Sequence, residues 1–327
     1  MAALHDALAG LGASLRTAGL TGRALAAWAG TSRIAALPAR LDAIRARPPT
    51  PADAMLALFV AGAELAAARL RMPAAVLDAL AAHALIERDG DRIRARVAIV
   101  PLGAALLVCD RLDAPVERDR VSWPDDSSHH LATALPVGRR ARWLDLACGS
   151  AYAALARPEL ATQISAVDLN ERAVRHATLG ARLSGIAQLA CEPGDIGDHQ
   201  PPADLVTCNA PIPPAAKTEA PEASDAAERW RHAEPGFFDR LWPALRVAVR
   251  PGGMIVLHAA HDALLAALGD AEGERVVVTY TPDHVRAFAI AWWRPDAPAR
   301  FAAWRRLLDV DRPHVDPADR EAALVLA

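Results

Sequence analysis

Cysteine is scarce in this sequence. Its 4 cysteines among 327 residues lie far apart, at positions 109, 148, 191 and 208, without a Cys-x-x-Cys pair or a histidine pair at zinc-ligand spacing beside them. A disulfide framework or a structural zinc site requires closer and more regular spacing. The sequence therefore predicts a reduced, cytoplasmic protein without a metal site.

Long uninterrupted apolar runs are also missing. The longest, residues 54–70, is broken by Glu64 and is short for crossing a bilayer. The first residues lack the charged start and continuous apolar segment of a secretory signal peptide. We therefore expect no membrane partner and interpret residues 54–70 as a buried helix.

A large excess of charge of one sign is absent too. The net charge is −3, with 53% hydrophobic and 23% charged residues, which is typical of a globular protein. This balance gives no reason to expect a polyanionic partner such as nucleic acid. The length allows two cores, and we expect a smaller domain at 1–112, a linker and lid at 113–130, and a larger domain at 131–327.

Helical spacing dominates the first residues. Apolar side chains recur every three or four positions over residues 4–71, which predicts short amphipathic helices. Next come a predicted helix ending near 82, a strand at 85–88, an Asp-Gly turn at 89–91 and an alternating strand at 92–100. A helix followed by such a hairpin is typical of a winged-helix module.

The hairpin carries Arg88, Arg92, Arg94 and Arg96, and winged helices often bind DNA. The last three point to one face of an alternating strand, however, as a solvated sheet surface also requires. We expect a scaffold or substrate-gripping role, with nucleic-acid binding as the alternative. In the linker, Ser127 or Ser128 is expected to cap a helix that runs to residue 135.

From residue 141 the pattern changes to alternating strands and helices. This alternation predicts a parallel sheet with helices on both faces. The last two strands are separated by only residues 281–285, which is too short for a crossover helix, so that pair is expected to be antiparallel. The fold class is α/β, with a Rossmann-like, mostly parallel sheet and an antiparallel C-terminal hairpin. The expected strands are 141–146, 163–168, 187–191, 204–208, 254–258, 275–280 and 286–293, with helices between the first five.

The loop after the first of these strands has the features of a ligand site. Small residues at 147, 149 and 151 let the backbone approach a ligand, and the next helix directs its first N–H groups toward it. A nicotinamide or flavin site would require G-x-G-x-x-G, and only Gly149 is present. A dinucleotide is therefore disfavoured.

An acid lies at the C-terminal end of each of three successive strands: Asp145, Asp168 and, in the turn after the third, Asp195. In such sheets ligands bind at the carboxyl ends of the strands. Asp168 is placed to accept hydrogen bonds from two ribose hydroxyls, and Asp195 from an adenine amino group. One aspartate at a strand end is often only a helix cap, but three in succession are harder to explain in that way.

These motifs resemble the class I S-adenosylmethionine-dependent methyltransferases over residues 126–295. The motifs are Asp145-x-Ala-x-Gly149-x-Ala151, Val167-Asp168-Leu169-Asn170, Gly194-Asp195-Ile196 and the segment 204–211. The resemblance implies S-adenosyl-L-methionine as cofactor, with its methionine end near Asp145 and Gly149. Alanines stand at 147 and 151, where glycine is more usual in that family. The cofactor-binding residues expected from the resemblance are Asp145, Ala147, Gly149, Ala151, Asp168, Leu169, Asp195, Ile196 and Asn209.

The segment Asn209-Ala210-Pro211-Ile212 is similar to the Asn-Pro-Pro-Tyr/Phe signature of methyltransferases that act on planar nitrogens, such as protein glutamine amides and guanine amines. An asparagine carbonyl and a proline-stiffened backbone carbonyl can hold such a nitrogen so that its lone pair faces the methyl group. The resemblance implies catalytic roles for Asn209 and Pro211. Ile212 replaces the aromatic residue, which argues against stacking on a flat substrate. Alternatively, the prolines merely end the strand.

Other residues are weaker candidates. His258 is the expected general base, together with His261, if the acceptor is a hydroxyl. Methyl transfer from a sulfonium is a direct displacement, so positioning alone can supply much of the rate. Substrate contacts are expected from Ile212 and, on the insertion 213–235, from Trp230 and His232. Cys148 and Cys208 are interpreted as packing residues.

The sequence therefore favours a methyltransferase whose acceptor is a nitrogen in a small molecule, a peptide or RNA. One alternative is an O- or C-methyltransferase of secondary metabolism. Another is a winged-helix DNA-binding regulator that senses the cofactor without turnover.

Overall fold

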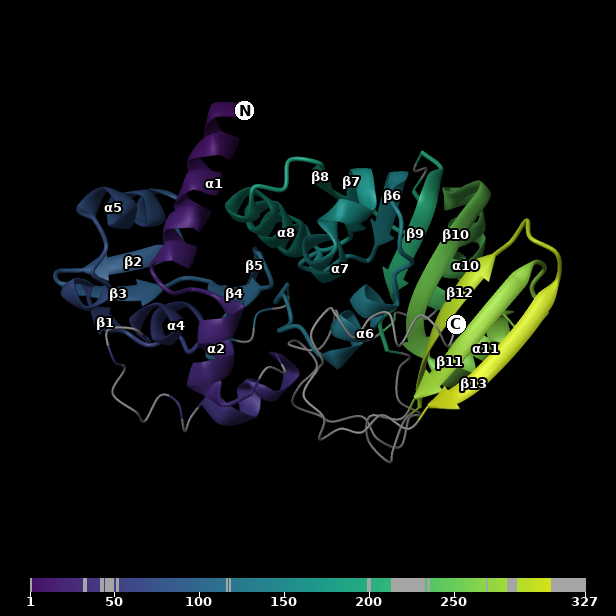
Figure 1. Cartoon of the computed structure of the whole chain (residues 1–327), viewed down its shortest axis with the longest axis horizontal. Coiled ribbons are helices and arrows are strands. Elements are labelled where there is room, and N and C mark those ends of the chain that lie inside the picture. Colours follow the sequence, from purple (N-terminus) through teal and green to yellow (C-terminus); the bar gives the residue numbers. More distant parts are fainter. Residues whose placement is uncertain are drawn as a thin grey trace.

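The computed structural model describes residues 2–31, 34–41, 44, 50, 53–115, 117, 119–198, 201–212, 233, 236–268, 270–280 and 287–306. Its centre is an eight-stranded sheet with the strand order β13-β11-β12-β10-β9-β6-β7-β8. An N-terminal region of helices and short strands lies beside it (Figure 1). The strands are β6 (Arg140–Leu146), β7 (Ala161–Asp168), β8 (Leu189–Pro193), β9 (Ala203–Asn209), β10 (Val249–Ala260), β11 (Glu274–Tyr280), β12 (Phe288–Arg294) and β13 (Arg300–Arg306).

The strand pairing confirms the predicted α/β fold with a mostly parallel, Rossmann-like sheet. β6 pairs in parallel with β7 and β9, β7 with β8, and β9 with β10, whereas β12 is antiparallel to β10 and β11. The chain moves outward from β6 to β8 and then returns to the other side of β6. This reversal between β6 and β9 opens a crevice at the carboxyl ends of these strands. β13, parallel to β11 at the sheet edge, was not predicted.

Helices cover the sheet, but not in every connection that the sequence predicted. Between β8 and β9 the described residues contain no helix, so that expectation is wrong. The connection is short and contains Pro201 and Pro202, which oppose helix formation. The helices of this half are α6 (Asp126–Ala134), α7 (Tyr152–Ala156), α8 (Glu171–Ser184), α10 (Phe237–Ala248) and α11 (His261–Leu268), with a short 3-10 helix at Pro158–Leu160.

α8 connects the sheet to the N-terminal region. Its N-cap is Asn170, whose side-chain oxygen accepts a hydrogen bond of 2.9 Å from the N–H of Arg172, and it ends at Gly185, which has a φ of 71°. Helix α1 packs directly against it (Figure 1). A Cβ atom at Gly12 of α1 would lie 1.8 Å from the carbonyl oxygen of Leu183, so only glycine permits this approach.

The N-terminal region contains two small sheets. β1, β3 and β2 form an antiparallel sheet in that order, and β4 pairs with β5 in a hairpin. Its helices are α1 (Ala2–Thr17), α2 (Gly22–Ala29), α4 (Ala54–Phe59) and α5 (Ala74–Ala82), with 3-10 helices at Ile34–Ala36, Pro38–Arg40 and Ala67–Leu70. Its strands are β1 (Leu65–Ala66), β2 (Ile86–Asp89), β3 (Arg92–Ala95), β4 (Ala98–Leu102) and β5 (Ala105–Cys109).

Three local expectations are corrected here. The apolar run 54–70 is not one helix, because α4 ends at Phe59 and Gly62 adopts a left-handed φ of 68°. The strand expected over 92–100 is two strands, since β4 pairs with β5 rather than continuing β3. Helix α6 is capped by Asp125 instead of a serine, and the Asp125 carboxylate accepts from the N–H of Ser127 at 3.0 Å.

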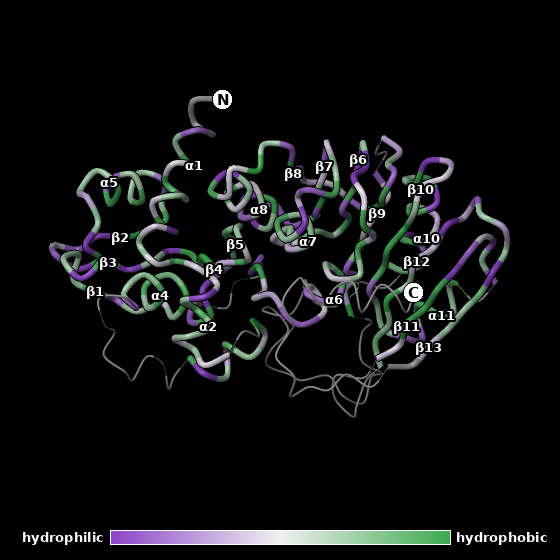
Figure 2. Tube along the Cα trace, in the orientation of Figure 1, coloured by the Kyte–Doolittle hydropathy of each residue, from purple (hydrophilic) through white to green (hydrophobic). Residues whose placement is uncertain are grey.

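Two hydrophobic cores lie on opposite faces of the sheet. Alternating residues of β6 divide between them: Trp143 belongs to the first core and Leu144 to the second. The first core also includes Leu15 and Phe59, so the N-terminal region and the sheet share one continuous interior. Hydrophobic colour follows the central parts of β10 and β12 in Figure 2.

In the part of the chain that the structure describes, no helix combines the length and hydrophobicity needed to cross a membrane.

Candidate functional site

The crevice at the carboxyl ends of β6, β7 and β9 contains a cavity of about 250 Å³. It brings together most of the residues that the sequence predicted for a site, although they come from four separate segments. Ten of the predicted residues line it: Asp145, Ala147, Gly149, Asp168, Leu169, Asp195, Ile196, Asn209, Pro211 and Ile212.

The loop after β6 has an unusual backbone. Ala147, Gly149 and Ala151 have φ values of 51°, 54° and 57°. The left-handed region suits glycine but costs an alanine on the order of 1 kcal/mol, so two alanines are held here in an unfavourable conformation. Ala151 stands at the N-cap position of α7 and is completely buried; it does not line the cavity.

Asp168, at the end of the neighbouring strand β7, accepts a hydrogen bond from this loop. Its Oδ2 accepts the N–H of Gly149 at 2.7 Å, and its Oδ1 accepts the N–H of Asn170 at 2.8 Å. Burial raises the pKa of Asp168, and the two backbone hydrogen bonds only partly oppose this effect. Each carboxylate oxygen has a second lone pair, so both can still accept hydrogen bonds from ligand hydroxyls.

Asp145 lies at the floor of the cavity and is almost fully buried. The hydroxyl of Thr207 on β9 donates to its carboxylate at 2.5 Å and accepts from the indole N–H of Trp143 at 2.8 Å. Burial raises the pKa of Asp145 to about 7; the Thr207 hydrogen bond opposes the rise and the charge of Asp168 adds to it. Thr207 was not predicted as a site residue, because its only signal in the sequence is one hydroxyl inside the buried strand β9.

Asp195 lies at the rim of the cavity beyond β8. Its Oδ2 is 3.5 Å from the guanidinium of Arg240, and its Oδ1 accepts from the N–H of Gly197 at 3.2 Å. Arg240 belongs to α10 and also lines the cavity; it was not predicted as a site residue. The neighbouring Ile196 is buried and offers an apolar surface.

Asn209, at the end of β9, is held by the first turn of α6. Its Nδ2 donates to the hydroxyl of Ser127 at 2.9 Å, and that hydroxyl in turn donates to Asp125. Residues 120–125 continue the wall of the cavity, so the segment expected to be a linker and lid contributes to the site.

Three aromatic residues line the cavity without having been predicted. Trp123 donates its indole N–H to the carbonyl of Ile34 at 3.1 Å, and Tyr152 is buried in α7. Phe237 begins α10 and packs edge-on against Phe238, with 5.3 Å between the ring centroids. They come from three distant segments, so no local pattern identifies them. An aromatic surface is therefore present although position 212 is isoleucine.

His258 is not brought to the cavity. It is buried beneath α6, with its Nε2 hydrogen-bonded to the hydroxyl of Tyr280 and its ring stacked on Phe288 at a centroid distance of 5.5 Å. Burial lowers the pKa of His258 to about 3, with a smaller contribution from His130, which leaves it neutral and poorly basic. His261 pairs with Asp262 at 2.8 Å and does not line the cavity either.

A tryptophan, a histidine and two cysteines remain from the sequence predictions. Trp230 and His232 lie outside the described residues. Cys148 lines the cavity, whereas Cys208 is buried behind it. Burial raises the pKa of both thiols, which therefore stay protonated.

No protein-family model matches this sequence, and no curated protein matches it. Solved structures resemble it at low identity. A predicted O-methyltransferase of Agrobacterium tumefaciens is 17% identical, with a TM-score of 0.42, over 60% of this chain and 95% of that one. The 16S rRNA N2 methyltransferase of T. thermophilus, solved with AdoMet and guanosine, is 17% identical, with a TM-score of 0.43, over 63% of this chain and 46% of that one.

A ribosomal protein L11 methylase from Lactobacillus delbrueckii subsp. bulgaricus is 18% identical, with a TM-score of 0.37, over 51% of this chain and 77% of that one.

Proposed function

We propose that this protein is an S-adenosylmethionine-dependent methyltransferase. The strongest support is that Asp145, Asp168 and Asp195 line one cavity together with Asn209. Each of the three acids lies at the end of a different neighbouring strand or in the turn after it. Structural caps need not share a cavity, whereas groups that hold a nucleoside must do so.

The residues fit such a cofactor by their chemistry. Asp168 has free lone pairs for the two ribose hydroxyls, and Asp195 with Ile196 offers an acceptor beside an apolar surface for adenine. Asp145, with a pKa of about 7, supplies negative charge at the floor of the cavity for a methionine ammonium group. When bound, S-adenosylmethionine would supply an activated methyl group.

The acceptor is proposed to be a nitrogen held by Asn209 and Pro211. Because Nδ2 of Asn209 is engaged by Ser127, its carbonyl Oδ1 remains to accept an N–H from the substrate. Trp123, Tyr152 and Phe237 supply flat apolar surfaces, which suits a planar acceptor in a small molecule, a peptide or RNA. The position of His258 outside the cavity gives no support to base-assisted transfer to a hydroxyl through that residue.

The N-terminal region is proposed to be winged-helix-like and to shape the substrate site rather than bind DNA. Its link to the cavity is Trp123, which contacts Ile34. Each arginine of the hairpin is already paired with a carboxylate, so little positive charge is left for phosphates. The pairs are Arg88–Asp78 at 2.6 Å, Arg92–Glu64 at 2.8 Å, Arg94–Asp113 at 3.6 Å and Arg96–Glu87 at 3.4 Å.

Transfer of a radiolabelled methyl group tests the proposal. Purified protein is incubated with labelled S-adenosylmethionine and, in separate reactions, with small molecules, peptides or RNA from a cell extract. The proposal is supported if one of these fractions becomes labelled and this labelling requires active protein. Binding of S-adenosylhomocysteine without any transfer, together with a DNA gel shift at low salt, would favour the regulator alternative instead.

A further inference from the structure

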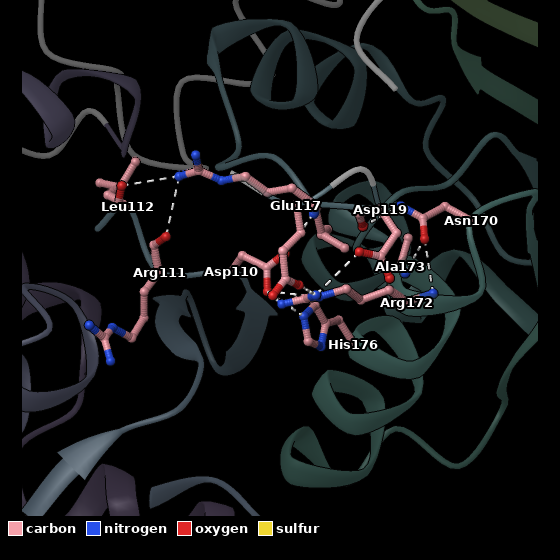
Figure 3. Close-up of polar contacts among 11 residues, drawn as sticks. Asp110, Arg111, Leu112, Glu117, Asp119, Asn170, Arg172, Ala173 and His176 are labelled. Carbon is pink, nitrogen blue, oxygen red and sulfur yellow. Dashed lines mark hydrogen bonds and ion pairs between the residues drawn. The ribbon is translucent and has the colours of Figure 1, made fainter. Parts of the chain in front are cut away.

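A buried carboxylate outside the cavity joins two of the cavity's walls. Asp110 directly follows β5 and is 2% exposed. Its Oδ2 accepts the N–H of Val121 at 2.7 Å, and its Oδ1 accepts from Arg172 Nη2 at 2.8 Å and lies 3.1 Å from His176 Nε2 (Figure 3). Burial alone would raise the pKa of Asp110, but the contacts with His176, Val121 and Arg172 outweigh it and hold the pKa below its usual value.

The partners of Asp110 belong to two different segments that line the cavity or adjoin it. Val121 lies in the wall formed by residues 120–125, which leads into helix α6 and its Ser127, the serine that accepts a hydrogen bond from Asn209. Arg172 lies in the first turn of α8, directly after the ribose-side residues Asp168 and Asn170, which line the cavity.

Further contacts join the same two segments (Figure 3). The Nδ2 of Asn170 donates to the backbone carbonyl of Asp119 at 2.9 Å. Arg172 also pairs with Glu117 and, at 3.3 Å, with Asp119. The two contacts of Arg172 depend on where Asp110 holds the guanidinium, because exposed carboxylates such as Glu117 contribute little fixed geometry of their own.

We propose that Asp110 is a positioning residue of the cofactor pocket: it fixes the Val121 wall against the start of α8 and so sets the width of the cavity across Asp168. The inference rests on the proposed function and adds a residue that does not touch the ligand. A single carboxylate can do this because it is buried and charged, so every partner that moves away leaves an uncompensated charge.

The contacts of Asp110 also connect the cavity to the N-terminal region. Asp110 directly follows strand β5 of the β4–β5 hairpin, and the N–H of Leu106 in that strand donates to the hydroxyl of Ser184 on α8 at 2.9 Å. The β4–β5 hairpin, α8 and the wall 120–125 are therefore linked by hydrogen bonds. Asp110 is the point at which all three meet.

The test compares Asp110→Asn with Asp113→Asn. Asp113 lies in the same segment and accepts two hydrogen bonds from Arg111, at 2.8 and 2.6 Å, yet it is not among the residues that line the cavity. Binding of S-adenosylhomocysteine to the full-length proteins is measured by calorimetry. We expect the Kd to rise about tenfold or more in Asp110→Asn and to stay within about twofold of wild type in Asp113→Asn, a factor of ten being 1.4 kcal/mol.

A spectroscopic measurement separates positioning from a loss of general stability. The emission of Trp123, obtained as the difference between each protein and its Trp123→Phe counterpart, reports on the wall itself. Without ligand we expect this difference spectrum to shift to the red in Asp110→Asn and to be unchanged in Asp113→Asn. An unchanged Trp123 spectrum together with unchanged affinity in Asp110→Asn overturns the inference.

A second variant keeps the test decisive if Asp110→Asn does not fold. Arg172→Gln removes a partly exposed side chain, and it is expected to weaken binding by severalfold. If both variants fold, the double variant is expected to lose little more affinity than the weaker-binding single variant, because the two residues act through one contact. Unchanged affinity in Arg172→Gln, or independent losses that multiply, contradicts the inference. A wild-type protein that does not bind S-adenosylhomocysteine refutes the proposed function itself.

Discussion

The hydroxyl of Thr207 donates a hydrogen bond of 2.5 Å to the carboxylate of Asp145, across the boundary between β9 and β6. The strand order of the sheet reverses at this boundary. The acid at the floor of the cavity is thus fixed by the neighbouring strand, and its burial raises its pKa to about 7. Its charge therefore changes within the physiological pH range.

Cofactor affinity should depend on pH through Asp145. The folded protein without ligand holds the proton of Asp145 up to about pH 7, whereas a bound methionine ammonium group favours the ionised form. Affinity for S-adenosylhomocysteine should therefore rise about tenfold between pH 6 and pH 8. In Asp145→Asn, titration calorimetry should give a much flatter profile. If the affinity of this variant still rises steeply with pH, the group that titrates is not Asp145.

Removing the Thr207 hydroxyl should destabilise the protein. Thr207→Val leaves the buried indole N–H of Trp143 and the Asp145 carboxylate without their shared partner, which costs about 1–3 kcal/mol. The free energy of unfolding from urea titration measures this loss. Thr207→Ser keeps the hydroxyl and is the matched control, so a loss in Thr207→Ser as large as that in Thr207→Val would contradict the role given to the hydroxyl.

The sequence predicted the sheet well where local pattern determines the structure. β9 is an almost continuous buried run, and β6 and β10 are buried over residues 143–146 and 253–260, as parallel strands covered on both faces are. The antiparallel hairpin followed from the short connection after Tyr280. The expected helix between β8 and β9 failed because that connection is short and carries two prolines.

The site was predictable only where its residues follow strand ends. The three acids and Asn209 were found in this way. The bond between Thr207 and Asp145 joins residues 62 positions apart, and that between Asp110 and His176 joins residues 66 apart, so no local motif records them. His258 was predicted to be in the site, but strand alternation turns its side chain beneath α6 and toward Tyr280 instead of into the cavity.

Asn209 should matter more for methyl transfer than for cofactor binding. Asn209→Ala is expected to lower the transfer rate by about 100-fold or more, as removal of one oriented polar group at a reacting centre does, while the Kd for S-adenosylhomocysteine changes by less than about fivefold. Single-turnover transfer and calorimetry measure the two effects. Ser127→Ala removes the closer of the two hydroxyls that accept from Asn209 Nδ2 and leaves that of Ser128, so it should give a smaller loss. Full activity in Asn209→Ala would favour the O- or C-methyltransferase alternative.

His258 should affect acid stability without affecting catalysis. Its pKa is about 3 in the folded protein and near 6.5 when unfolded, so its neutral form stabilises the fold fully above pH 6.5, and this contribution is lost as the pH falls toward 3. In His258→Gln, the free energy of unfolding should fall less steeply between pH 6.5 and 4 than in wild type. The variant should still transfer methyl groups, and its inactivity with normal cofactor affinity would restore the general-base role.

The most direct test of the account is calorimetry of S-adenosylhomocysteine binding to wild-type protein and Asp168→Ala. Asp168 lies where two ribose hydroxyls would add to its bonds with Gly149 and Asn170, and hydrogen bonds to a charged group are worth about 1.5–3 kcal/mol each. We predict one-to-one binding to wild type and a Kd at least about tenfold higher in the variant. Equal affinity in the two proteins would contradict the account.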